Sequence, residues 1–139
     1  MDQLKKYWEN VEKAKAVFLA TAAKESVTMR TVSPVYYKDA ILIYTNPESQ
    51  KYKQLKENPY CCIAAGGCFM EAKPEFLGRT MSDENASLRE IYAKKFNDAF
   101  DENDDYDIKT TEFILLKPIR IKGWNFENGV PTSPFEYDF

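Results

Sequence analysis

Two neighbouring segments, T-M-R-T-V-S-P-V (28–35) and I-L-I-Y-T-N-P-E-S-Q-K (41–51), decide the fold of this chain. The first is rich in β-branched residues and predicts a strand, and the run I-L-I-Y-T predicts another. Asn46 is a favoured N-cap and Pro47 is favoured at the first helical position, so we expect a helix over 47–57. An N-P pair then ends the helix. The sequence therefore predicts a strand that leads directly into a short helix.

Outward from these segments, hydrophobic periodicity predicts further strands and helices that do not alternate regularly. The predicted helices cover 3–15, 47–57 and a segment from Ser82 or Asp83 to Phe100. The predicted strands cover 17–22, 26–35, 41–45, 60–65, 69–80 and 110–124. Six strands with so few helices disfavour a doubly wound parallel sheet. They favour a mainly β (α+β) fold, an antiparallel barrel that is closed or nearly closed, with helices packed outside.

The length of 139 residues predicts one domain, over residues 1–124, followed by a tail over 125–139. An acidic connector, D-E-N-D-D-Y-D (101–107), separates the last predicted helix from the last predicted strand. We expect the tail to be loosely ordered. Its aromatic residues are nevertheless too many for an indifferent solvent-exposed segment, and they favour docking on the barrel or on a dimer partner.

Composition excludes several classes of function. A net charge of −3, with both signs interleaved, gives no reason to expect a nucleic-acid or membrane partner. No signal peptide or membrane span is apparent, which predicts a cytoplasmic protein. The chain has three cysteines and no histidine, so neither a zinc site nor Ser-His or Cys-His catalysis is expected. A bound cofactor is therefore expected to carry any chemistry.

The start of the predicted helix has the features of a phosphate pocket. The first amides of a helix lack partners and carry partial positive charge, which favours an anion. Ser49 adds a hydroxyl group and Lys51 a full positive charge. Arg30, on the neighbouring strand, could bring a planar guanidinium group to the same phosphate oxygens. Taken separately, Arg30 and Lys51 would each more often be solvated surface charges.

Together these motifs resemble a known family. R-T-V-S-P-V (30–35), Y-T-N-x-x-S-x-K (44–51) and the N-P pair at 58–59 are similar, in order and spacing, to the flavin-binding core of the pyridoxamine 5′-phosphate oxidase-like split barrels. The resemblance implies a six-stranded antiparallel split β-barrel with Greek-key character and flanking helices. It also implies FMN as the cofactor and a homodimer with flavin sites at the subunit interface.

The resemblance assigns roles to particular residues. The phosphate of FMN would be held by Arg30 and Lys51, with Ser49 and Thr45 assisting and Gln50 beside them. Tyr44 would lie at the ribityl or phosphate end. The backbone of Thr31, Val32, Ser33, Pro34 and Val35 would run along the isoalloxazine ring. Lys73 stands about where a glutamine from the other subunit commonly reaches the flavin. Trp124 would either stack at the flavin edge or close the barrel.

The oxidase's C-terminal Arg-x-His element has no counterpart after Trp124. The resemblance therefore points to the branch of general stress proteins and nitroimidazole-resistance proteins rather than to the oxidase itself. We expect an FMN-dependent oxidoreductase that passes electrons from a reduced nicotinamide or similar donor to a small acceptor. A non-catalytic flavin store or redox sensor is the alternative. Haem or a deazaflavin on the same barrel is a further possibility.

Overall fold

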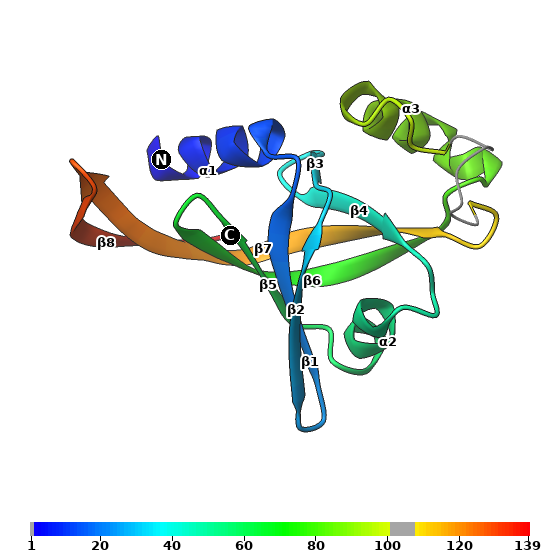
Figure 1. Ribbon diagram of the computed structural model, residues 1–139, viewed down its shortest axis with the longest axis horizontal. Helices are drawn as coiled ribbons and strands as arrows, with labels where there is room; N and C mark the ends of the chain where they lie inside the picture. The colour runs from blue at the N-terminus through cyan, green and yellow to red at the C-terminus, as the bar shows by residue number, and fades with distance from the viewer. Residues whose placement is uncertain (1, 101–107) are drawn as a thin grey trace.

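The computed structural model describes residues 2–100 and 108–139, so the acidic connector 101–107 lies outside the described residues (Figure 1). The helices are α1 (Asp2–Lys13), α2 (Gln50–Glu57) and α3 (Ala86–Lys95), with a short 3₁₀ helix, η1 (Asp83–Asn85), before α3. The strands are β1 (Val17–Ala23), β2 (Ser26–Val32), β3 (Val35–Tyr36), β4 (Ile41–Thr45), β5 (Cys61–Ala65), β6 (Cys68–Arg79), β7 (Glu112–Glu127) and β8 (Val130–Asp138).

The strands form one antiparallel sheet in the order β2-β1-β5-β6-β7-β4-β3, with β8 paired to β7. The edge strands β2 and β3 are consecutive in the chain and are joined only by Ser33 and Pro34. The sheet curves toward closure but stays open at this two-residue link, where Pro34 has no N–H to offer a ladder. The predicted mainly β, split-barrel fold is confirmed. The described sheet has eight strands rather than six, because β3 and β8 were not expected.

One row of side chains marks the centre of the barrel. Leu19 lies opposite Ile63, Ile63 opposite Met70, and Met70 opposite Ile121, and all four are fully buried. Because side chains alternate along a strand, this row fixes which face of four strands points inward. Helix α1 packs Tyr7, among others, against the same core. In Figure 1, α1 and α3 lie above the long strands β6 and β7, and α2 lies below them.

The two predicted helices that follow the first strands have different limits from those expected. Helix α2 begins at Gln50 rather than Pro47, because the Ser49 side chain caps it by accepting the N–H of Tyr52 at 3.3 Å. The Asn46 side chain instead accepts the N–H of Glu48, which holds a turn before the helix. Helix α3 ends at Lys95 rather than Phe100, because the backbone leaves the helical region at Phe96.

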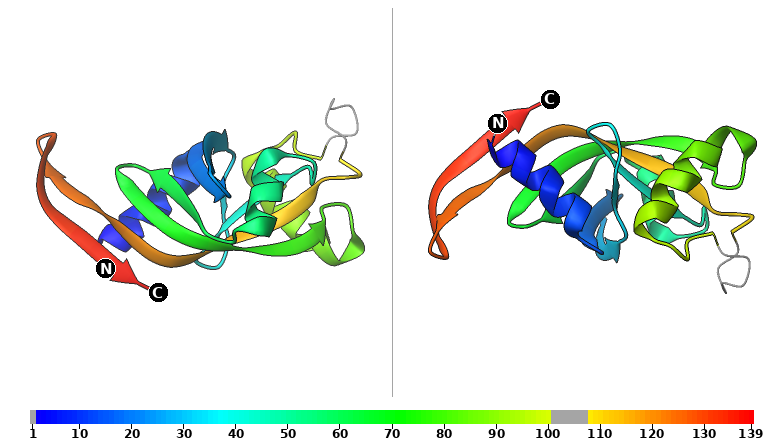
Figure 2. Two further views of the ribbon diagram at one scale, coloured as in Figure 1. Left: turned by 90° about the horizontal axis from the view of Figure 1, so that it is seen from below. Right: turned by 90° about the horizontal axis from the view of Figure 1, so that it is seen from above.

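The tail was wrongly expected to be loosely ordered. Strand β7 runs on to Glu127, and β8 pairs back along it to form a two-stranded arm that projects beyond the rest of the sheet (Figures 1 and 2). The turn is Asn128-Gly129, with φ values of 51° and 79°. An Asn-Gly pair with positive φ at both positions suits a tight hairpin, so the sequence did contain this signal.

None of the helices in the described part of the chain is long and apolar enough to cross a bilayer.

The central row predicts where stability is concentrated. Leu19→Ala should lower the free energy of unfolding by about 2–5 kcal/mol, because it removes a fully buried side chain and leaves a cavity. Val130→Ala, on the exposed arm, should change it by less than about 0.5 kcal/mol. Chemical denaturation at one protein concentration measures both. Equal effects of the two substitutions would contradict the assigned core.

Candidate functional site

A hollow of about 210 Å³ lies where β2, β4 and α2 meet. It is lined by Thr31, Val32, Ser33, Tyr44, Lys51 and Tyr92. All of these except Tyr92 were predicted as cofactor-binding residues from the sequence. The structure thus brings the end of β2, the end of β4 and the start of α2 to one place.

Arg30 points from β2 toward α2 and is held by a chain of hydrogen bonds. Its Nη1 donates to the Leu19 carbonyl oxygen at 3.2 Å and to the Thr21 hydroxyl at 2.7 Å, and its Nη2 donates to the Thr28 hydroxyl. The two threonine hydroxyls in turn donate to Oε1 of the buried Gln54, at 2.5 and 2.6 Å. Helix α2 therefore fixes the position of the guanidinium group through one amide oxygen.

Lys51 lies on the same helix, in the hollow, and is half-buried. Burial lowers the pKa of its ammonium group, and the positive charge of Arg30 lowers it further. Burial also lowers the pKa of Arg30. Within the described residues the Lys51 ammonium group has neither a hydrogen bond nor an ion pair. Two cations thus share a partly desolvated place without a carboxylate, an arrangement that an anion would stabilise.

The start of α2 adds neutral donors to this pair. Ser49 caps the helix and its hydroxyl lies 3.0 Å from the hydroxyl of the buried Thr45. The amides of Gln50 and Lys51 are in the first turn, where backbone N–H groups have no partner within the helix. The partial positive charge of these N–H groups favours an anion such as a phosphate group at this end of the helix.

The other predicted residues lie apart from this group within one chain. Pro34 and Val35 are buried, and Val35 packs in a second core cluster with Leu42, Leu88, Tyr92 and Phe113. The Gln50 side chain is exposed. On β6, the Lys73 ammonium group lies 5.0 Å from the centre of the Tyr60 ring. Trp124 lies on the arm and lines a separate hollow with residues that include Phe69 and Phe135.

Sequence reasoning missed two supports of the site. Tyr92, within the third predicted helix, was given no role at the site, yet its hydroxyl donates to the Ser33 carbonyl oxygen at 2.7 Å. Gln54 was not singled out, although it anchors Arg30 through Thr21 and Thr28. No local spacing could have identified either residue, because each contact joins segments that are far apart in the sequence.

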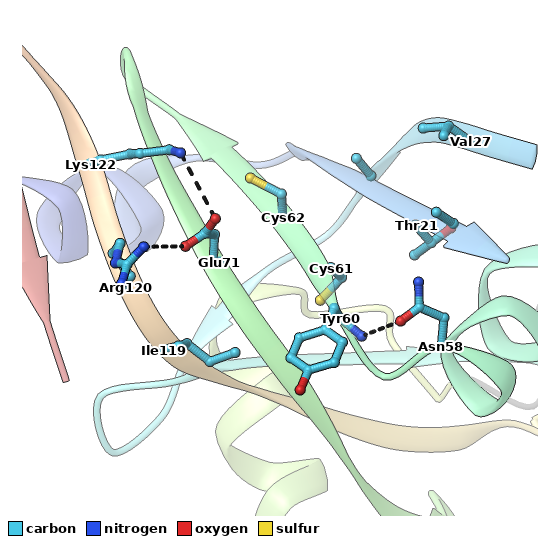
Figure 3. A pocket seen from close by; sticks show the side chains of 12 residues that line it. Thr21, Val27, Asn58, Tyr60, Cys61, Cys62, Glu71, Ile119, Arg120 and Lys122 are labelled. Atoms are coloured by element: carbon cyan, nitrogen blue, oxygen red, sulfur yellow. Dashed lines mark hydrogen bonds and ion pairs between the residues drawn. The ribbon is translucent and has the colours of Figure 1, made fainter.

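A larger hollow, of about 540 Å³, lies on the outer face of the sheet (Figure 3). Small side chains of β1 and β5, such as Ala20, Ala22 and Cys62, form its floor. At one side the carboxylate of Glu71 lies 3.8 Å from Nη1 of Arg120 and 3.9 Å from Nζ of Lys122. This hollow contains none of the residues predicted to bind the cofactor, and its two cations, Arg120 and Lys122, are already paired with Glu71.

Comparison with known proteins agrees with the fold and with the motif positions. The family model described as pyridoxamine 5′-phosphate oxidase matches residues 4–125. The chain belongs to the pyridoxamine 5′-phosphate oxidase family. The match contains both segments that form the hollow, and it confirms the resemblance found in the sequence.

Solved structures of this family have the same fold at low sequence identity. A pyridoxamine 5′-phosphate oxidase-type protein from Listeria innocua is 17% identical, with a TM-score of 0.66 and coverage of 86% of this chain and 95% of that one. A FAD-binding protein from Mesorhizobium loti is 12% identical, with a TM-score of 0.64 and coverage of 84% and 90%. HutZ, a haem storage protein from Vibrio cholerae, is 15% identical, with a TM-score of 0.66 and coverage of 82% and 88%. No curated protein matches the sequence. At these identities the likeness shows the fold alone.

The proximity of the two cations in this member of the oxidase family has a measurable consequence. The pKa of Lys51 should lie below its ordinary value of 10.5. Arg30→Gln should raise that pKa, because a positive neighbour that disfavours the protonated amine has been removed. The value should remain below 10.5, since burial is the larger cause. NMR titration of the lysine ε-carbon, assigned with Lys51→Arg, measures both values. An unchanged pKa in Arg30→Gln would show that the two groups do not interact.

Proposed function

We propose that this protein binds FMN and that Arg30 and Lys51 hold its phosphate group. The observation that carries the proposal is a pair of cations, Arg30 on β2 and Lys51 at the start of α2, to which no carboxylate of the described residues is paired. The chemistry of the surrounding donors fits a phosphate: a guanidinium group, an ammonium group, the hydroxyls of Ser49 and Thr45, and unpaired helix amides.

The rest of the cofactor is assigned to the wall of the hollow. Tyr44 would contact the ribityl chain, and the backbone from Thr31 to Val35 would run along the isoalloxazine ring. The hollow of about 210 Å³ is smaller than ligand pockets usually are, about 300–1,000 Å³. A single chain therefore offers the phosphate end of a site, and another surface must cover the ring.

We assign that surface to a second copy of the chain. The outer face of the sheet exposes Val27, Met29 and Phe18 by 78%, 66% and 51%. The register places Val27 and Met29 beside the small side chains of Ala22 and Ala20 on β1, and Phe18 beside Ala64 on β5. Contiguous apolar surface of this kind suits a protein interface. In a dimer through this face, Lys73, Trp124 and the β7–β8 arm of one protomer would reach the flavin of the other.

Bound FMN would supply the electron transfer, taking two electrons from a reduced nicotinamide or a similar donor and passing them to a small acceptor. The chain itself supplies binding, orientation and shielding, since no histidine is present for acid–base work. A non-catalytic role as a flavin store or redox sensor is the alternative. Anaerobic mixing with NADH or NADPH distinguishes them: an oxidoreductase bleaches the flavin absorption within seconds, and a store does not.

Haem is a weaker candidate for this chain, although a neighbour of the same fold stores it. Haem iron is usually held by an axial ligand, most often histidine, and this sequence contains no histidine. The absorption spectrum of the protein after addition of FMN or haem decides between the two. Uptake of haem with no uptake of FMN would overturn the proposed function.

The phosphate assignment predicts a difference between two lysines of one helix. Lys51→Met should weaken FMN binding by about 1.5–3 kcal/mol, the range for hydrogen bonds to charged groups. Lys53→Met is the matched control. Lys53 is exposed on the same helix, and its ammonium nitrogen lies 3.3 Å from a carboxylate oxygen of Glu48, so this substitution should leave the affinity for FMN nearly unchanged. Fluorescence titration with FMN measures both variants. Equal losses would contradict a specific role for Lys51.

The dimer assignment predicts a difference between two exposed methionines. Met29→Glu places a charge at the centre of the apolar outer face and should convert the dimer to a monomer. Met81→Glu, at an exposed position after β6, should leave the dimer intact. Sedimentation velocity measures the mass of each. A wild-type protein that is monomeric at micromolar concentration would contradict the assignment.

A further inference from the structure

The link between the two edge strands is held by α3 rather than by the sheet. Strand β2 ends at Val32 and β3 begins at Val35, so Ser33 and Pro34 lie outside both. Both of their carbonyl oxygens nevertheless accept a hydrogen bond from a side chain of α3. The Tyr92 hydroxyl donates to Ser33 at 2.7 Å, and the Lys95 ammonium group donates to Pro34 at 2.7 Å.

The two donors are themselves fixed. Tyr92 is buried and its ring packs edge-on against Tyr44, at 5.1 Å between ring centres, so it joins the hollow to α3. Lys95 is half-buried and also donates to the Val11 carbonyl oxygen of α1 at 2.8 Å. One ammonium group therefore ties the end of α3 to the end of α1 and to the link. Burial lowers the pKa of the Lys95 ammonium group, while the nearby Glu12 raises it and Lys15 lowers it.

We infer that Tyr92 and Lys95 are positioning residues that set the backbone against which the flavin ring lies, and that the Lys95 charge raises the reduction potential of the flavin. The inference rests on the proposed function and deepens it. A link of two residues without ladder partners would sample several conformations, and two short hydrogen bonds restrict it to one. A binding surface that is already ordered loses less free energy when the ligand binds.

The two residues differ in charge, which separates their effects. Reduction adds negative charge to the flavin ring. A positive charge bound to the carbonyl oxygen of the link, along which the ring is proposed to lie, favours the reduced state. Lys95 supplies such a charge on the protein side of the link. Tyr92 is neutral, and burial raises the pKa of its hydroxyl, so it stays neutral. Lys95 should therefore affect both affinity and potential, whereas Tyr92 should affect affinity alone.

The test compares the FMN affinity and the flavin reduction potential of the full-length protein and its variants. Lys95→Met should weaken FMN binding on the order of tenfold and shift the potential to a more negative value. Lys94→Met, at the exposed neighbouring position, should change neither. Lys95→Arg should restore both, because it keeps a charged donor. Tyr92→Phe should weaken binding without changing the potential.

Each outcome bears on the inference. A Lys95→Met variant that matches the wild type in both properties overturns it, as does a Lys95→Arg variant with the potential of Lys95→Met. If Lys95→Met does not fold, Lys95→Gln, which keeps a hydrogen-bond donor but not the charge, takes its place, and an unchanged reduction potential in that variant overturns the inference. A wild-type protein that takes up no FMN overturns the proposed function, and the inference with it. Normal FMN uptake with no effect of either residue overturns the inference alone.

Discussion

The structure around the candidate site depends on one electrostatic constraint: Arg30 and Lys51 lie close enough for the charge of one to lower the pKa of the other. Two like charges in a partly buried place destabilise the folded chain unless something offsets them. The described chain brings no carboxylate to them. It brings donors instead, from the Ser49 cap and the start of α2. A site made only of donors and positive charge is suited to an anion with several oxygens, and a phosphate group has that chemistry.

The fold explains how the two cations are held together. Arg30 is on β2 and Lys51 is on α2, and the buried Gln54 connects the two elements by accepting hydrogen bonds from Thr21 and Thr28. The edge strands of the sheet are joined by the Ser33–Pro34 link, and Ser33 of this link lines the same hollow. Helix α3 fixes this link from outside the barrel. The opening in the sheet thus adjoins the proposed cofactor site, and the exposed outer face is the surface that we propose a second copy covers.

Local sequence patterns predicted much of this arrangement. Hydrophobic periodicity predicted an antiparallel barrel, and the family resemblance predicted its split form. The motif from Arg30 to Lys51 contains five of the six residues that line the hollow. The errors at element ends have local causes. Two residues could cap α2, and Ser49 does so in place of Asn46. The Asn128-Gly129 turn, overlooked in the sequence, lets the tail pair with β7 as strand β8. The contacts of Tyr92, Lys95 and Gln54 are long-range. They depend on how α2 and α3 pack on the sheet, which no single segment encodes.

The central claim is that this chain recognises a phosphate group, and riboflavin is FMN without that group. The most direct measurement is therefore the dissociation constant of each flavin for the same wild-type protein, by fluorescence titration under identical conditions. The account predicts that FMN binds at least about tenfold more tightly, as expected when charge-assisted hydrogen bonds to the phosphate are lost. Equal affinities for FMN and riboflavin would contradict it, because Arg30 and Lys51 would then not be contributing to flavin binding.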